Sequence, residues 1–287
     1  MNVGLIGLGL MGSAIATRLA SEGPLHVWNR TPAAMIPLVK AGAVPAESAA
    51  DLFSSCETVV MMVSDEHAID DVLSTVELGG RTLVQMSTVR PSYSQSLSQR
   101  VTSAGGRYVE APVSGSRQPA LEGQLVGMLA GEPGVLDDVE RLLTPVCATI
   151  VRCGAPPQAM EMKLAVNTFL ITVVTGLAEA FHFAETHRLD SRLLDQILGT
   201  GPMSSFVSRA KAAAIVSGDF SPQAAIPDVL KNARLVVESA ADHGAASTLM
   251  DACAALYAET SSLGHGREDM AAVIFAYRNR TEEIRRG

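Results

Sequence analysis

This chain of 287 residues has few charged side chains: Asp, Glu, Lys and Arg make up only 18% of it, against about 25% in an average globular protein. Hydrophobic residues reach 47%. That balance excludes a disordered chain and predicts extensive burial, in a core or at a subunit interface. The formal net charge is −8, and a negative surplus gives no electrostatic reason to bind nucleic acid or an anionic membrane.

Cysteine is also rare, with four residues and no C-x-x-C pair. None stands at metal-ligand spacing from a histidine, so the sequence predicts neither a metal site nor a disulfide framework. The amino terminus carries a glycine series where a signal peptide would have a continuous apolar run. Polar residues interrupt the apolar stretch 164–181, which therefore predicts a buried helix and no membrane span. We expect a cytoplasmic protein with reduced thiols.

The two halves of the chain differ in texture, and the length is about twice that of a typical single domain. The first half alternates β-branched runs with helical periodicity, as expected for a parallel sheet covered by helices on both faces. Its seven candidate strands are residues 2–7, 25–28, 58–63, 82–86, 107–110, 125–130 and 149–152. The second half is rich in Ala and Leu without strand signals. We predict an α/β domain over residues 1–160 and an all-α domain over residues 161–287.

A G-x-G-x-x-G motif, Gly7-Leu8-Gly9-Leu10-Met11-Gly12, follows the first strand and opens a helical pattern. Its first glycine allows a tight turn, its second lets the backbone approach a pyrophosphate, and its third permits close helix–strand packing. Backbone N–H groups of Leu10, Met11 and Gly12 can donate to the phosphates. With a strand on either side, the motif predicts a Rossmann-type dinucleotide-binding domain rather than an ordinary glycine-rich turn.

The second strand ends at Trp28-Asn29-Arg30-Thr31, where NAD-selective proteins usually place an acid that binds the ribose 2′-hydroxyl. No acid is present here. Asn29 offers neutral donors, Arg30 can form charge-assisted hydrogen bonds with a 2′-phosphate, and Thr31 can add a hydroxyl. The sequence therefore predicts NADP(H) as the cofactor. The alternative is that Arg30 is a solvated surface charge.

Another strand closes with Glu110-Ala111-Pro112-Val113-Ser114-Gly115-Ser116, and residues 119–125 read P-A-L-E-G-Q-L. Backbone N–H groups and the Ser114 hydroxyl at this turn form a nest that suits a small carboxylate. Taken alone, the segment is more often a turn with no ligand. The run resembles the substrate-binding signature of the β-hydroxyacid dehydrogenase (3-hydroxyisobutyrate dehydrogenase-like) family, and with V-W-N-R-T at 27–31 it looks most like the glyoxylate/succinic semialdehyde reductase branch.

Lys163 and Asn167 lie at i and i+4, so both side chains project from one helical face. The chain has only four lysines against eighteen arginines, and a desolvated ammonium can give up its proton near neutral pH whereas a guanidinium cannot. The family resemblance implies that Lys163 of this K-x-x-N motif is catalytic, that Asn167 orients the substrate, and that Ser114 and Gly115 hold the substrate carboxylate. The alternative for Lys163 is a snorkelling side chain beside an interdomain salt bridge.

Three further segments match the family less specifically. Thr88 lies in an S-T-x-x-P segment that the family places beside the nicotinamide, although a turn or helix cap would also use a threonine there. Lys231 matches a lysine that closes over the cofactor, but Asn232 follows it where the family usually has Asp. Met62, Val63 and Ser64 match, in type only, a main-chain segment laid against the adenine.

The resemblance implies an NADPH-dependent oxidoreductase that reduces a small carboxylate-bearing aldehyde or ketone, such as glyoxylate or succinic semialdehyde, or oxidises a β-hydroxy acid. It also implies a long helix beginning near Lys163 between the two domains, an active site in the interdomain cleft, and a homodimer or homotetramer built through the helical domain. Pocket residues are expected around Ser204, Phe206 and Phe220.

Two alternatives share this scaffold. One is an imine reductase, whose relatives generally carry Asp or Tyr in place of the lysine, and the other is a non-catalytic NADP-binding scaffold, whose relatives have lost that lysine. Lys163 argues against both. Near the carboxyl terminus, charges at 267–269 predict a solvated turn and a helix start, and the mixed charges of residues 278–286 predict an exposed final helix.

Overall fold

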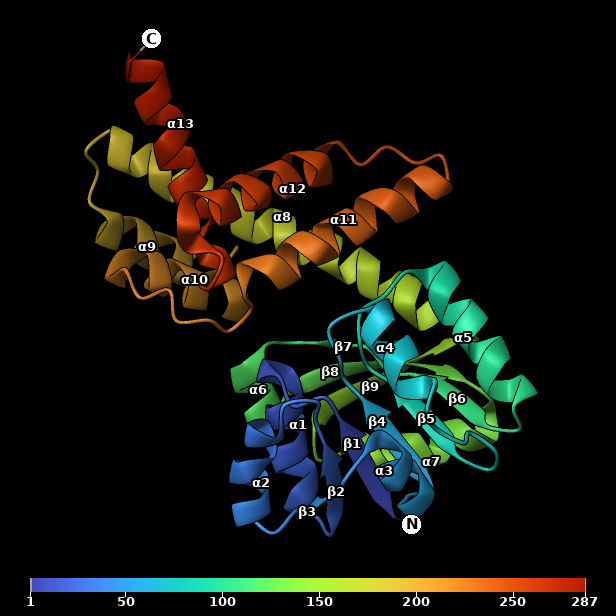
Figure 1. Cartoon of the computed structure of the whole chain (residues 1–287). Helices are drawn as coiled ribbons and strands as arrows, with labels where there is room; N and C mark the ends of the chain where they lie inside the picture. Colours follow the sequence, from blue (N-terminus) through green and yellow to red (C-terminus); the bar gives the residue numbers. More distant parts are fainter. Residues whose placement is uncertain (1, 287) are drawn as a thin grey trace. The chain divides into compact units, whose positions relative to one another are not determined.

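The computed structural model describes residues 2–286. The chain forms two compact units, one ending at Lys163 and the other beginning at Leu164. The first unit is α/β and the second is all-helical, with the long helix α8 (Gln158–Thr186) crossing the boundary (Figure 1). The predicted fold class is therefore confirmed.

The first unit is built on a nine-stranded sheet. Its strands are β1 (Val3–Ile6), β2 (Leu25–Trp28), β3 (Val44–Pro45), β4 (Thr58–Met61), β5 (Thr82–Gln85), β6 (Arg107–Glu110), β7 (Val113–Ser114), β8 (Leu125–Gly131) and β9 (Cys147–Gly154). The order is β3-β2-β1-β4-β5-β6-β8-β7, with β9 paired to β8. All seven predicted strands are present, and the two-residue strands β3 and β7 are additional.

The sheet is mixed, whereas the sequence predicts a parallel one. Strands β1 to β6 pair in parallel, but β8 runs antiparallel to β6 and to β7. A parallel partner requires a crossover of about a dozen residues, usually helical. The only helix between β6 and β8 is the five-residue α6 (Arg117–Leu121), so the chain turns back beside the strand it has just left.

The strand order changes direction at β1, because the chain passes from β1 to β2 on one side and later reaches β4 on the other. In doubly wound sheets, ligands bind beyond the carboxyl ends of the strands at such a switch point. The loops that follow β1 and β4 begin at Gly7 and Met62. Both segments predicted to contact a dinucleotide therefore lie at the switch point.

Helices cover both faces of this sheet. One apolar cluster includes residues of α1 (Leu10–Ala20), α6 and α7 (Pro133–Leu143), and the other includes residues of α3 (Ala49–Ser55), α4 (Glu66–Leu73) and α5 (Pro91–Ser103). Successive residues of a strand belong to opposite clusters, as Leu5 and Ile6 do, because side chains alternate between the two faces of the sheet along a strand. After β2 the chain forms a 3₁₀ turn, η1 (Pro32–Met35), and the short α2 (Ile36–Lys40).

The second unit packs helices around α8. They are α9 (Ser191–Thr200), α10 (Phe206–Ser217), α11 (Ile226–Asp242), α12 (Thr248–Thr260), the π-helical turn η2 (Ser261–His265), the 3₁₀ turn η3 (Met270–Val273) and α13 (Ile274–Arg286). Gly218 ends α10 with a φ of 72°, a conformation that other residues rarely adopt.

Helix α8 is long and apolar enough to cross a membrane by length and composition, and 44% of its most apolar window is buried. Leu164, Ile171, Val174 and Phe181 lie in the core of the second unit, at intervals of seven and three residues that keep them on one helical face. Phe169 is 75% exposed. The helix thus has a buried stripe, as predicted, and an exposed apolar face.

Asp269 is not part of a solvated turn, so that prediction is wrong. It is buried, and its two carboxylate oxygens accept hydrogen bonds from Lys211 Nζ at 2.7 and 2.8 Å. They also accept the backbone N–H groups of Gln223, Ala224 and Ala271. A buried carboxylate is tolerated only when it is paired in this way, and all of these partners except Ala271 are distant in sequence.

Candidate active site

The glycine loop after β1 packs so tightly that two of its positions exclude a side chain. Gly7 has a φ of 95°, and a Cβ there would lie 2.2 Å from the carbonyl oxygen of Met62. A Cβ at Gly12 would lie 1.9 Å from the Gly7 oxygen. These contacts join the loop to the end of β4 and to α1, as a tight turn before a close-packed helix requires.

Gly9 is different, because no heavy atom of residues 2–286 beyond Gly9 itself and its two chain neighbours lies within 4 Å of the position a Cβ would take. Gly9 is the N-cap of α1, no side chain of the described residues caps the helix, and its first turn contains no acid. The N–H groups of Leu10, Met11 and Gly12 come before the first helical hydrogen-bond donor, Ser13 N to Gly9 O at 2.9 Å. An uncapped helix start beside open space fits the pyrophosphate of a dinucleotide.

The end of β2 is tied to this loop by Asn29. Its Oδ1 accepts the Leu8 N–H at 2.9 Å, and its Nδ2 donates to the Thr31 carbonyl at 3.0 Å. Asn29, predicted to offer donors to a 2′-phosphate, thus uses one of them within the protein. The Arg30 guanidinium is exposed and has no hydrogen bond or ion pair to residues 2–286, which leaves its donors available to an anion.

The loops after β4 and β5 are joined by the side chain of Ser87. The Val63 N–H donates to Ser87 Oγ at 2.9 Å, and the buried Gln85 hydrogen-bonds both the N–H and the carbonyl of Ser87. Ser64 Oγ donates to Asp65 at 3.0 Å. Two predicted cofactor segments therefore follow neighbouring strands whose ends are hydrogen-bonded to each other. Met62 to Ser64, predicted to lie near the adenine, follow β4, and Thr88, predicted to lie near the nicotinamide, follows β5.

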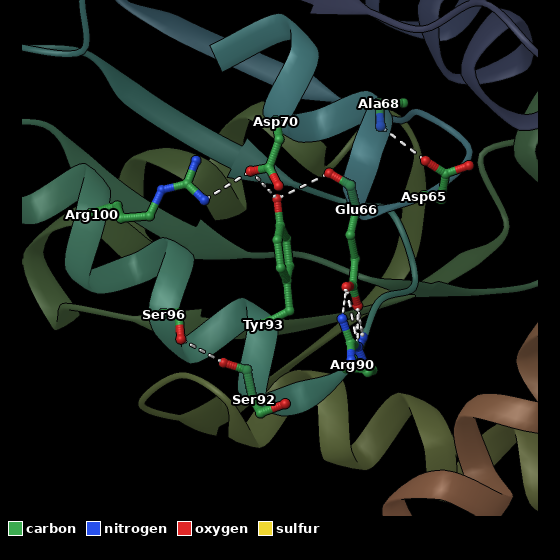
Figure 2. Close-up of polar contacts among 9 residues, drawn as sticks. All are labelled: Asp65, Glu66, Ala68, Asp70, Arg90, Ser92, Tyr93, Ser96 and Arg100. Atoms are coloured by element: carbon green, nitrogen blue, oxygen red, sulfur yellow. Dashed lines mark hydrogen bonds and ion pairs between the residues drawn. The ribbon is translucent and has the colours of Figure 1, made fainter. Parts of the chain in front are cut away.

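A network of charged side chains links α4 to α5 beyond these loops (Figure 2). Arg90, the residue before α5, pairs with Glu66 at the start of α4 through its N–H and Nε, each 3.0 Å from Oε1. Tyr93 and Arg100 both donate to Asp70 at 2.8 Å. Partial burial raises the pKa of Asp70, but hydrogen bonds from Arg100 and Tyr93 outweigh it, so the pKa is below its ordinary value. The network fixes the spacing of the two helices.

The turn predicted to hold a carboxylate lies between β7 and α6. Val113 pairs with Gly127 and Ser114 with Val126 of β8, so the segment is held as a short strand. Gly115 has a φ of 126°, and a Cβ there would lie 2.5 Å from the Leu125 side chain. Only glycine fits that conformation and space.

Lys163 and Asn167 lie on α8, four residues apart, as predicted. Lys163, the last residue of the first unit, is 8% exposed, and Asn167 in the second unit is 2% exposed. Asn167 Nδ2 has no hydrogen-bond partner among the described residues. A buried donor without a partner is costly unless a ligand satisfies it.

The remaining predicted residues belong to the second unit. Lys231 lies on α11, where the neighbouring Asn232 has a buried Oδ1 without a partner among residues 2–286. Ser204 Oγ accepts a hydrogen bond from Arg209 at 2.7 Å. Phe206 begins α10 and is exposed, and Phe220 packs edge-on against Phe275.

No role is predicted from the sequence for Glu110, the last residue of β6. Its side chain is fully buried and accepts hydrogen bonds from the backbone N–H groups of Ala159 and Met160 at 3.1 and 3.3 Å. The sequence offers one signal for this buried carboxyl group. Glu110 ends an apolar strand of a sheet predicted to be covered on both faces, and the ends of such strands are usually buried.

The fold and the glycine loop define an NAD(P)-binding protein of the Rossmann type. Residues 2–154 match the NAD binding domain of 6-phosphogluconate dehydrogenase, and residues 158–277 match the family described as NAD-binding of NADP-dependent 3-hydroxyisobutyrate dehydrogenase. Glyoxylate/succinic semialdehyde reductase 1 of Arabidopsis thaliana is 30% identical over 283 residues, covering 96% of this chain and 98% of that protein. The chain therefore belongs to the 3-hydroxyisobutyrate dehydrogenase-like β-hydroxyacid dehydrogenase family, which confirms the resemblance seen in its motifs.

Other relatives extend beyond this chain or share mainly its fold. The cytokine-like nuclear factor N-PAC of Xenopus tropicalis is 31% identical over 282 residues, which cover 96% of this chain but 53% of N-PAC. The chain thus spans about half the length of N-PAC. The structure of 3-hydroxyisobutyrate dehydrogenase from Salmonella typhimurium has a TM-score of 0.88 at 22% identity and covers 96% of this chain and 99% of its own, a likeness that shows the fold.

Proposed function

We propose that the protein is an NADPH-dependent reductase that converts a small carboxylate-bearing aldehyde or ketone, such as glyoxylate or succinic semialdehyde, to the hydroxy acid, or catalyses the reverse oxidation of a β-hydroxy acid. The observation that carries this proposal is a buried lysine on the first turns of α8. The α8 start is hydrogen-bonded to Glu110, the residue that opens the segment leading to Ser114 and Gly115.

The choice of NADPH over NADH rests on the end of β2. No acid follows the strand, so no carboxylate is available to bind a ribose 2′-hydroxyl or repel a 2′-phosphate. Arg30 is exposed and has no partner among residues 2–286, and Thr31 is exposed beside it. A guanidinium there can form charge-assisted hydrogen bonds to a phosphate.

Bound NADPH would supply the hydride that reduces the carbonyl carbon. The Lys163 Nζ would donate a proton to the carbonyl oxygen as it becomes an alkoxide, so one C–H and one O–H bond form as the C=O π bond is lost. The buried Asn167 Nδ2 would donate a hydrogen bond to that oxygen. Ser114 and Gly115 would hold the substrate carboxylate, which orients the carbonyl toward both donors.

The proposal is tested by following NADPH consumption with a panel of glyoxylate, succinic semialdehyde, 3-oxo acids and a cyclic imine. We expect turnover of at least one carboxylate-bearing carbonyl, and its loss in Lys163→Met. Turnover of the imine alone would support an imine reductase. Tight NADPH binding with no turnover of any compound would support a non-catalytic scaffold.

Exposed apolar side chains of the second unit support a homodimer or homotetramer. Phe169 and Met203 are each 75% exposed and Ile197 is 65% exposed. Apolar surface of this kind on a folded unit commonly marks an interface. Sedimentation of the wild-type protein as a monomer at micromolar concentration would contradict this assembly.

A further inference from the structure

Glu110 has a buried carboxyl group that accepts three hydrogen bonds within the first unit. Oε2 accepts from Ala159 N–H at 3.1 Å and Met160 N–H at 3.3 Å. Oε1 accepts from Ser94 Oγ, which in turn lies 2.6 Å from the Tyr108 hydroxyl. The group therefore joins β6, α5 and the start of α8.

The two N–H groups that Glu110 binds are those of the second and third residues of α8. Helix-start N–H groups have no acceptor within the helix, and they form the positive end of the helix dipole. A carboxyl oxygen at this position caps the helix from 49 and 50 residues away in sequence. The first turn of α8 is thus fixed by a residue of the sheet rather than by its own N-cap.

Lys163 follows Ala159 by four residues and Met160 by three, so it lies on the helical face above the capped groups. In the other direction, Glu110 is followed by Ala111 and Pro112 and then by the β7 strand that ends at Ser114. One carboxyl group therefore connects the backbone leading to the carboxylate turn with the helix turn preceding the lysine.

We propose that Glu110 is a positioning residue for the reduction: its carboxyl group fixes the first turn of α8, and hence Lys163 Nζ, relative to the turn at Ser114 and Gly115, and it does so most tightly when ionised. This inference rests on the proposed function. A hydrogen bond to an ionised acceptor is roughly twice as strong as a neutral one. A shift of about 1 Å in a reacting group can cost roughly 100-fold in rate.

Burial is the main reason why the pKa of Glu110 is raised to about 7. Hydrogen bonds from Ser94, Met160 and Ala159 lower the pKa and the charge of Glu161 raises it, and the value of about 7 already includes these effects. The charged form is therefore gained or lost near neutral pH.

Few groups around Glu110 change charge in the same range. Burial raises the pKa of Tyr108 on β6. Burial, and then the Glu110 charge, raise the pKa of Cys153 on β9. Both stay protonated near neutral pH. On α8, Glu161 acts on Glu110 through its charge, and Lys163 lies two residues further along the same helix.

Three variants separate geometry from charge. Glu110→Met removes both acceptors at similar volume. Glu110→Gln keeps an acceptor for α8 and a donor for Ser94, as the neutral acid would, but cannot ionise. Glu161→Gln is the matched control, because Glu161 is an exposed acid on the same turn of α8.

We expect Glu110→Met to lower kcat by roughly 10- to 100-fold. NADPH affinity should stay within about twofold of wild type, because the glycine loop follows β1 and Glu110 ends β6. The ratio of wild-type kcat to Glu110→Gln kcat should rise severalfold from pH 6 to pH 8.5. The same ratio for Glu161→Gln should change far less, because the Glu161 charge is the smallest of the effects on the pKa of Glu110. A folded Glu110→Met enzyme with wild-type kcat, or a flat ratio for Glu110→Gln, would overturn the proposal.

A readout without catalysis keeps the inference distinct from the proposed function. In protein labelled with ¹⁵N-alanine and ¹⁵N-methionine, the amide signals of Ala159 and Met160 should titrate with a midpoint near 7 in wild type and stay unchanged in Glu110→Gln. Absence of that titration would refute the proposal that the capping of α8 tightens when Glu110 ionises. Titration in a protein that turns over no compound of the panel would refute the proposed function and leave the capping of α8 standing.

Discussion

Replacing Glu110 by glutamine should make the protein more stable at alkaline pH, although we expect the same change to slow the proposed reaction. The glutamine amide reproduces the neutral acid, since Oε1 can accept from the α8 N–H groups and Nε2 can donate to Ser94. It removes only the ionised state, which burial disfavours. A merely structural role would move stability and rate in the same direction, so the opposed changes are diagnostic.

The magnitude follows from linkage between ionisation and folding. The folded-state pKa is about 7 and the ordinary value is 4.5, and each pH unit between them corresponds to about 1.4 kcal/mol. The native state binds more protons than the unfolded state in this interval, so the contribution of Glu110 to stability is fully present below pH 4.5 and is lost as pH rises through 7. The total loss in wild type is about 3 kcal/mol.

Denaturant unfolding followed by tryptophan fluorescence measures this loss of stability in the first unit, which contains Glu110. The single tryptophan, Trp28, lies on β2 of that unit. The free energy of unfolding of Glu110→Gln minus that of wild type should increase by about 2 to 3 kcal/mol between pH 5 and pH 8.5. Glu161→Gln should show no comparable change. A Glu110→Gln difference that stays constant within about 0.5 kcal/mol would show that Glu110 does not ionise near neutral pH in the folded protein.

Three other changes test separate parts of the molecule. Arg30→Ala should weaken NADPH binding by roughly 10- to 100-fold through loss of charge-assisted hydrogen bonds and leave NADH binding unchanged, as measured by fluorescence titration; equal losses for both cofactors would exclude a role in 2′-phosphate binding. Lys163→Met should lower kcat at least about 100-fold in steady-state assays while NADPH still binds, and retained turnover would remove the lysine from the mechanism. Lys211→Met should destabilise the second unit by about 3 to 5 kcal/mol in circular-dichroism melts or denaturant unfolding, because it leaves the Asp269 carboxylate buried without its cation; a loss below about 1 kcal/mol would show that the backbone N–H groups alone satisfy it.

Local features of the chain were predictable because they arise from nearest neighbours. The glycine loop from Gly7 to Gly12 follows from backbone sterics, and the absence of an acid after Trp28 can be read directly. The division into an α/β and a helical unit follows from periodicity, since strands and helices repeat at different intervals. Lys163 and Asn167 share a helical face for the same reason.

These elements, their order and the residue types at each strand end all follow from local properties of the sequence. Tertiary structure alone decided the antiparallel course of β8, the burial of Asp269 against Lys211, and the capping of α8 by Glu110. Each of these depends on groups far apart along the chain that meet only after folding. The spacing of residues in the sequence does not reveal such long-range contacts, because an Asp or Glu has the same letter whether its carboxylate is solvated or buried among hydrogen-bond donors.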